Sequence, residues 1–298
     1  MTVKKLTRRE ALKSMALGAA GSVFLGSLPW KAFGKRSAQK SKVILIRDKN
    51  LLDSSGEINK GVLETMLDKA VPTLTGDSDV STAWNKIIKP DDVVGIKSNE
   101  WSRLPTPSAL EQIIKERVMG AGVNGSDISI DDRSILQNPI FKNSTALINS
   151  RPMRTHDWAG VGSLIKNYIM FHPKPYEYHP DTCANLAQIW KKPMVKGKTR
   201  LNILVMITPL FHGVGPHHFN KKYTWKYNGL IVGFDPVAVD TTGLRIIQAK
   251  RTEYFGEERP ISPSPHHIKL ADTRHNLGNA DPNNIELVKM GWQEGMLI

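Results

Sequence analysis

Two aspartates near the start of a predicted helix are the clearest candidates for chemistry in this sequence. Asp235 ends an apolar, β-branched run and is followed by Pro236, a pairing typical of a helix N-cap and a first helical residue. Asp240 then shares a helical stripe with apolar residues, namely Val237, Leu244 and Ile247. A carboxylate on a core-facing stripe needs a metal, a cation or several hydrogen bonds. Asp235 and Asp240 are therefore candidate metal ligands and Asp240 a candidate catalytic group, with capping of a neighbouring backbone as the alternative role for Asp240.

A glycine-containing loop supplies a second set of candidates. All nine histidines lie between residues 156 and 275, and His212 follows the most strand-like run of the chain. His212 is a candidate metal ligand or acid–base group. Gly213 and Gly215 would expose backbone N–H groups to an anion or a cofactor. No His-Glu-x-x-His or comparable spacing occurs, so a divalent metal is predicted only from the combination of Asp235, Asp240 and His212.

Two Lys and Asn pairs complete the predicted site. Lys97 and Asn99 end one apolar run, and Lys166 and Asn167 end a glycine-bearing segment. The lysines would neutralise a small anionic substrate while the asparagines orient it, and Lys166 is also a candidate for proton transfer. We predict one pocket that joins Asp240 with Lys97 and Lys166. The alternative is an internal ion pair that only stabilises the fold.

The elements that must position these residues alternate between strands and helices. Apolar runs predict strands at residues 43–46, 92–97, 128–130, 201–207 and 229–234. Helical stripes predict helices at residues 62–70, 82–88, 106–121 and 236–251, and the first is expected to end at Pro72. The alternation predicts an α/β fold with a mostly parallel mixed sheet flanked by helices. Ligands gather at the carboxyl ends of such strands, where we expect Lys97, Asn99, Asp131, Asp132 and Asp235.

A hairpin is predicted before the last of these strands. Asn228-Gly229 is a signal for a tight type I′ turn. It predicts that residues 223–227 pair with residues 230–234. The C-terminal part of the domain is therefore expected to be a hairpin–strand–helix unit.

Composition and cysteine usage exclude several classes of function. The 298 residues carry a net charge of +13, but residues 1–34 hold six basic residues and one acidic residue, so the remainder carries +8. Because no dense basic tract occurs, there is no strong nucleic-acid signal. Cys183 is the only cysteine, which excludes an internal disulfide, a four-cysteine iron–sulfur cluster and a c-type haem attachment. Any cofactor beyond a divalent metal ion is left unknown.

The N-terminus has the pattern of an export signal. Arg8 and Arg9 stand in a Thr-Arg-Arg-x-x-Leu-Lys segment, and a weakly apolar run follows at residues 15–28. This pattern predicts a twin-arginine signal peptide over residues 1–34 and a single α/β domain over residues 35–298. The twin-arginine translocase is then the partner during export, and the periplasm the destination. The run is shorter than the roughly 20 residues of a membrane span, so no transmembrane span is expected in the mature protein.

Several stretches together resemble the domain of unknown function 362 family. The most specific is Asp-Pro-Val-Ala-Val-Asp at residues 235–240, and residues 94–99, 160–167 and 213–216 resemble other segments of the family in the expected order. The resemblance implies the α/β fold, and the twin-arginine leader also occurs in this family. Some members carry a ferredoxin-like cluster domain whose cysteines this chain lacks. The family often has an aspartate after the central strand, whereas this chain has Thr208 and Pro209 there.

Two functions of different classes fit these observations. The first is an enzyme that binds a metal or an anion and acts on a small anionic substrate. The second is a non-catalytic binding protein or redox-accessory protein of the cell envelope. The family has no established reaction, so the resemblance does not separate them.

Overall fold

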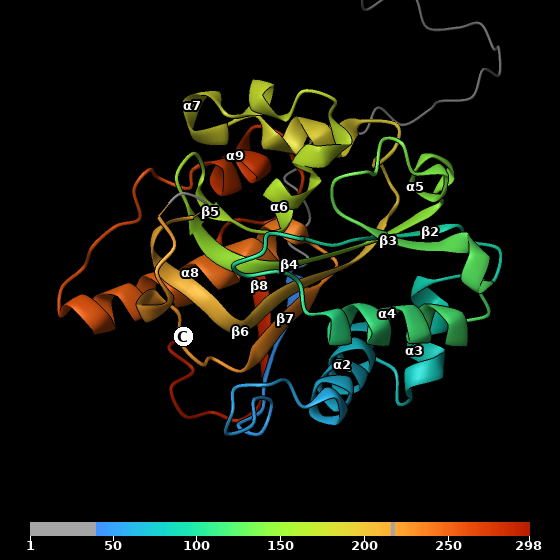
Figure 1. The fold of residues 1–298 in the computed structure, drawn as a ribbon, viewed down its shortest axis with the longest axis horizontal. Coiled ribbons are helices and arrows are strands. Elements are labelled where there is room, and N and C mark those ends of the chain that lie inside the picture. The colour runs from blue at the N-terminus through green and yellow to red at the C-terminus, as the bar shows by residue number, and fades with distance from the viewer. Residues whose placement is uncertain (1–39, 216–217) are drawn as a thin grey trace, which may run out of the picture. The chain divides into compact units, whose positions relative to one another are not determined.

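The core of the fold is an eight-stranded sheet. The computed structural model describes residues 40–215 and 218–298. The strand order is β3-β2-β4-β6-β7-β1-β8, with the short strand β5 paired to β4 (Figure 1). The strands are β1 (Ser41–Arg47), β2 (Val94–Lys97), β3 (Ile128–Asp131), β4 (Ala146–His156), β5 (Gly160–Gly162), β6 (Thr199–Gly215), β7 (Gly229–Gly233) and β8 (Ile285–Gly291).

Strand direction makes this a mostly parallel mixed sheet, which confirms the predicted fold class. β2 runs parallel to β3 and β4, β4 runs parallel to β6, and β1 runs parallel to β8. β7 is antiparallel to both of its neighbours, β6 and β1. The residues that follow β7 therefore lie at the opposite edge of the sheet from the residues that follow β2, β3 and β4.

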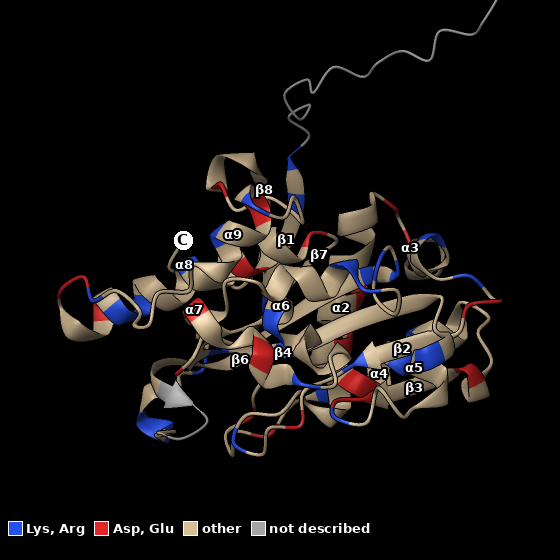
Figure 2. Cartoon of the chain, turned by 90° about the horizontal axis from the view of Figure 1, so that it is seen from above, with Lys and Arg blue, Asp and Glu red and all other residues tan. Residues whose placement is uncertain are grey.

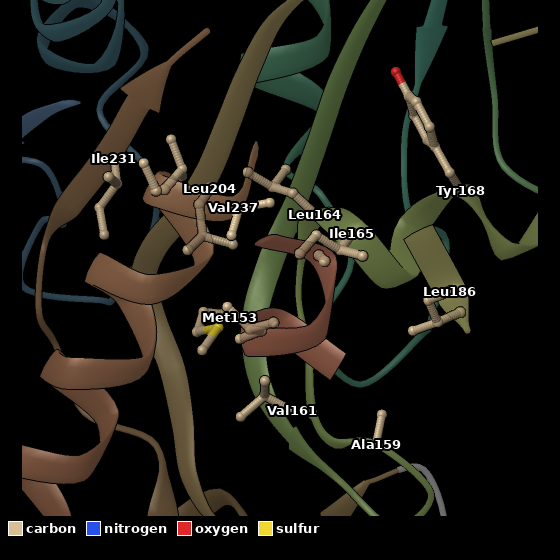
Figure 3. Packing of buried hydrophobic residues seen from close by; sticks show 14 of the residues in the cluster. Met153, Ala159, Val161, Leu164, Ile165, Tyr168, Leu186, Leu204, Ile231 and Val237 are labelled. Carbon is tan, nitrogen blue, oxygen red and sulfur yellow. The ribbon is translucent and has the colours of Figure 1, made fainter. Parts of the chain in front are cut away.

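Helices cover both faces of the sheet. They are α2 (Lys60–Thr75), α3 (Val80–Ile87), α4 (Ser108–Gly120), α5 (Pro139–Asn143), α6 (Leu164–Asn167), α7 (Pro180–Cys183), α8 (Pro236–Phe255) and α9 (His267–Thr273). One apolar cluster joins the sheet to α2, α3 and α4. A second cluster joins the other face to α6, α8 and α9 (Figure 3). No helix of the described residues is long and apolar enough to cross a membrane.

Side-chain caps fix where the main helices begin. Asn59 accepts a hydrogen bond from the Val62 N–H at the start of α2, and Asp235 accepts from the N–H groups of Val237 and Ala238 at the start of α8. The predicted N-cap role of Asp235 is thus confirmed. The predicted end of the first helix at Pro72 is wrong, because α2 continues to Thr75. Pro72 is buried on the inner face of α2, and this packing offsets the hydrogen bond that proline cannot donate.

The predicted pairing around Asn228 is also wrong. Asn228 has a positive φ of 56°, as a tight turn requires. The N–H groups of Tyr227 and Asn228 nevertheless both donate to the Ile207 carbonyl. β7 pairs on one side with residues 202–206 of β6 and on the other with β1. Because β7 already has a strand on each side, residues 223–227 cannot lie beside it, although the strand and the following helix are formed as predicted.

Candidate functional site

Four basic side chains are buried together at the carboxyl ends of β2 and β4. Lys97, Arg151, Arg154 and Lys166, called the cationic cluster from here on, are exposed to 0%, 4%, 4% and 3%. Lys97 ends β2 opposite Asn149 of β4, so Arg151, two residues further along β4, projects from the same face of the sheet. α6 supplies Lys166. Basic segments of β2, β4 and α6 are visible in Figure 2.

Among the described residues, one carboxylate forms an ion pair with the cationic cluster. Lys97 Nζ donates to Asp132 Oδ1, and Asp132 Oδ2 also accepts from the Glu100 N–H at 2.9 Å. Burial lowers the pKa of Lys97 to about 8, although the charge of Asp132 opposes this. Burial acts to raise the pKa of Asp132, but the charge of Lys97, the hydrogen bonds from the Glu100 N–H and Lys97, and the charge of Arg151 together hold that pKa below its ordinary value. This pair accounts for one of the four cations.

Neither arginine forms an ion pair within the described residues, although the charge of Asp132 acts on both of them. Burial lowers the pKa of Arg151 to about 10 and lowers that of Arg154 well below its ordinary value. Arg154 donates to Asn99 Oδ1 at 2.9 Å and lies 4.3 Å from the Trp101 ring centre. The Nε atoms of both arginines are buried without a hydrogen-bond partner among the described residues. Such orphaned donors are costly, and an anion would satisfy them.

Arg151 lies close against the backbone of β5. A Cβ atom at Gly162 would be 2.7 Å from Arg151 Nη2, so a larger residue there would require this guanidinium to shift. The charge of Arg151 acts on Lys97, Lys166 and Asp132. The charge of Arg151 therefore repels both of the predicted lysines, Lys97 and Lys166.

Lys166 lies beside the buried thiol of Cys183. Its Nζ atom lies 3.6 Å from Cys183 Sγ, and within the described chain no carboxylate is at ion-pair distance from it. Burial lowers the pKa of Lys166 to about 8, and repulsion from Arg151 adds to this. Burial, followed by the charges of Lys166 and Arg151, also lowers the pKa of His156, which is therefore neutral.

The predicted asparagines hold the framework of the site. Asn167 Nδ2 donates to Asn149 Oδ1 at 2.9 Å, and Asn167 Oδ1 accepts from Lys97 Nζ at 3.4 Å. Asn99 accepts from Arg154. These bonds and the charge of Arg151 place Lys97, Asn99, Lys166 and Asn167 in one region of the structure.

Asp240 caps α6. It is fully buried and accepts from Ser163 Oγ at 2.6 Å and from the N–H groups of Leu164 and Ile165, each at 2.9 Å. Burial raises the pKa of Asp240 to about 6 against the effect of these bonds. Neither Lys97 nor Lys166 is within ion-pair distance of Asp240. The geometry therefore supports the capping role, in which Asp240 positions the helix that carries Lys166.

The three predicted metal ligands do not meet, so that prediction is wrong. Asp235 accepts from Ser41 Oγ and the Asn279 N–H at the start of α8. His212 contacts Arg251 near the end of α8, and this 20-residue helix is about 30 Å long. The physical reason is the antiparallel direction of β7, which carries Asp235 to the other edge of the sheet. Across residues 40–215 and 218–298, no three His, Cys, Asp or Glu side chains are grouped to hold a metal ion.

The structure describes no contact between the cationic cluster and the two predicted glycines, Gly213 and Gly215. Gly213 has a φ of 83°, and its carbonyl accepts from Thr155 Oγ1. Gly215 is paired with His156 at the end of β4. Both glycines therefore lie beside the strand that supplies the two arginines.

Arg151 and Arg154 are the functional residues that sequence reasoning missed. They lie inside β4, which is buried along its whole length. Its central residues, Asn-Ser-Arg-Pro-Met-Arg at 149–154, are mostly polar and include a proline, so the segment does not resemble a strand. The feature of the sequence that could have identified this segment is the presence of two arginines between predicted strands.

Fold and site together define an α/β protein with a buried, positively charged site at the carboxyl ends of parallel strands. Residues 111–245 match the model of the family described as "Domain of unknown function (DUF362)", which supports the resemblance found in the sequence. The matched region contains Asp132, Arg151, Arg154, Lys166 and Asp240, whereas Lys97 precedes it. No curated protein and no solved structure matches the chain.

Proposed function

We propose that this protein binds a small anion at the cationic cluster. The observation that carries the proposal is an imbalance of buried charge. Four basic side chains are buried together, and the buried carboxylates near them are those of Asp132 and Asp240. Buried charges without partners are strongly unfavourable, so an excess of cations is typical of a site that a ligand completes. The unpartnered Nε atoms of Arg151 and Arg154 would donate to that ligand. A carboxylate or phosphate group suits guanidinium donors best.

A neighbouring cavity supports access to this site. A cavity of about 820 Å³ is lined by Asn99 and Glu100 after β2, by Ile130 of β3 and by residues around the start of α4, including Thr106. Asn99 is also the hydrogen-bond partner of Arg154. We infer that the ligand enters from this cavity and that its charged group reaches the arginines past Asn99.

Turnover of the bound anion is favoured by one further observation. Burial lowers the pKa of Lys166 to about 8, which brings proton transfer within reach near neutral pH. Perturbed lysines inside a buried site are typical of enzymes. We therefore propose a small anionic substrate, with Arg151 and Arg154 binding it and Lys166 moving a proton.

Anion binding is tested with inorganic phosphate, sulfate and acetate in calorimetric titrations. We expect Arg151→Gln to weaken binding of the preferred anion by about 10- to 100-fold, since a charge-assisted hydrogen bond contributes about 1.5–3 kcal/mol. Arg117→Gln is the matched control, because Arg117 is bonded to Glu64 and Asp68 on the opposite face of the sheet. Unchanged affinity in Arg151→Gln, or no binding of any of the three anions to the parent protein, would contradict the proposal.

We further propose export through the twin-arginine route to the periplasm. Arg8, Arg9 and the apolar run after them lie outside the described residues, so the sequence pattern alone supports this step. We expect the double substitution Arg8→Lys and Arg9→Lys to keep the protein folded in the cytoplasm. Fractionation with an antibody to residues 40–298 measures this. A periplasmic signal that persists in the double variant would contradict the proposed route.

A further inference from the structure

A groove between α8 and α9 is separate from the cationic cluster. One face of α8 lines it with residues at helical spacing, namely Thr241, Leu244, Arg245 and Gln248. α9 lines the other wall with Ile268, Lys269, Asp272 and Thr273. The groove encloses about 580 Å³, within the range of small-molecule sites. We call it the α8–α9 groove.

The α8–α9 groove is largely apolar, and the buried hydroxyl of Thr241 lies in it. Its apolar lining includes Leu244, Ile261, Ile268, Pro260, Pro265 and Ala280. Thr241 is 7% exposed, and its Oγ1 atom has no hydrogen-bond partner in the described structure. Because buried hydroxyls are normally satisfied, this atom indicates a missing partner inside the groove.

The charged residues of the groove favour an anion. Arg245 and Lys269 are exposed, and neither forms an ion pair within the described part of the chain. The two acidic residues of the lining are differently placed: Asp272 accepts from the Ala280 N–H and Asp281 from the Asn283 N–H, both near 2.8–2.9 Å. Backbone N–H groups thus hold both carboxylates in place, whereas Arg245 and Lys269 have no ion-pair partner within the described residues and can turn toward a ligand.

We propose that the α8–α9 groove binds a small amphipathic anion, with an apolar body against Leu244, Ile261 and Ile268 and a carboxylate beside Arg245 and Lys269. A polar atom within the body would pair with Thr241 Oγ1. This site does not depend on the cationic cluster: Asp240 faces α6, while Thr241, the next residue of α8, faces the groove.

The experiment compares octanoate with octylammonium and acetate as probes, using nuclear magnetic resonance titration of the protein. Octanoate should bind saturably and perturb signals of α8 and α9. Octylammonium has the same apolar body with the opposite charge, and acetate has the charge without the body, so both should bind at least tenfold more weakly to the groove.

Conservative variants identify the contacts. We expect Arg245→Gln and Lys269→Gln each to weaken octanoate binding about two- to fivefold, as for exposed ion pairs. Arg151→Gln changes only the cationic cluster and should leave octanoate affinity in the groove unaltered. If octylammonium binds as tightly as octanoate, or if the double variant Arg245→Gln with Lys269→Gln retains full affinity, the proposal is overturned.

Discussion

Replacing Lys166 with methionine should stabilise the ligand-free protein by about 3 kcal/mol at pH 7. The structural reason is that Lys166 is buried beside Arg151 without a carboxylate partner. Burial lowers its pKa from 10.5 to about 8, and a difference of this size corresponds to about 3 kcal/mol. Methionine fills a similar volume without a charge. Denaturant unfolding of the parent and variant proteins measures the difference.

The stabilisation should depend on pH in a defined direction. Folded Lys166 loses its proton near pH 8, whereas the unfolded side chain keeps it to about 10.5. Between these values the unfolded state binds more protons, so the parent protein gains stability as pH rises. The advantage of Lys166→Met should therefore be full below pH 8 and should disappear by about pH 10.5.

A surface lysine provides the matched control for this measurement. Lys69 is exposed on α2, and Lys69→Met should change the free energy of unfolding by no more than about 0.5 kcal/mol at any pH. Residues that serve a binding site often lower the stability of the protein. We therefore expect Lys166→Met to be more stable than the parent protein and to bind phosphate more weakly. A variant that is less stable than the parent at pH 7 would show that the lysine is structural.

Local sequence patterns sufficed to predict most of the elements around the site. The run at residues 201–207 falls within β6, and the helical stripe after Asp235 becomes α8. Lys97 and Asn99 were expected at the carboxyl end of a parallel strand, and they do lie there. Such predictions succeed because a buried strand and an amphipathic helix each have a periodicity that their own residues determine.

The rest of the site depends on contacts that no local pattern contains. The direction of β7 is set by its two neighbours, β6 and β1, and it decides that Asp235 and His212 lie apart. Asp240 was correctly placed on a buried stripe, but its partners are backbone groups from residues 164 and 165, more than seventy residues earlier. Arg151 and Arg154 lie in a strand whose polar sequence does not identify it as one.

The ion pair between Lys97 and Asp132 should be the most sensitive point of the buried site. Lys97 is fully buried and Asp132 is 4% exposed, so neither charge can turn to water when its partner is removed. Asp132→Asn keeps the shape of the side chain and leaves four buried cations with Asp240 as the remaining carboxylate. We expect a loss of about 3–5 kcal/mol in the free energy of unfolding at pH 7, the usual cost of breaking a buried pair from one side.

A double-mutant cycle separates this pair from general damage to the core. Lys97→Met alone should also destabilise the protein, because Asp132 then keeps only its bond from the Glu100 N–H and the more distant charge of Arg151. The double variant Asp132→Asn with Lys97→Met removes both charges, and buried pairs replaced in this way are often neutral in stability. We therefore expect the double variant to be more stable than Asp132→Asn by at least about 2 kcal/mol, so that the two single losses do not add, as is typical of directly interacting residues. If the two single losses simply add, Lys97 and Asp132 do not act as a pair, and Lys97 would then be a free cation of the site like Lys166.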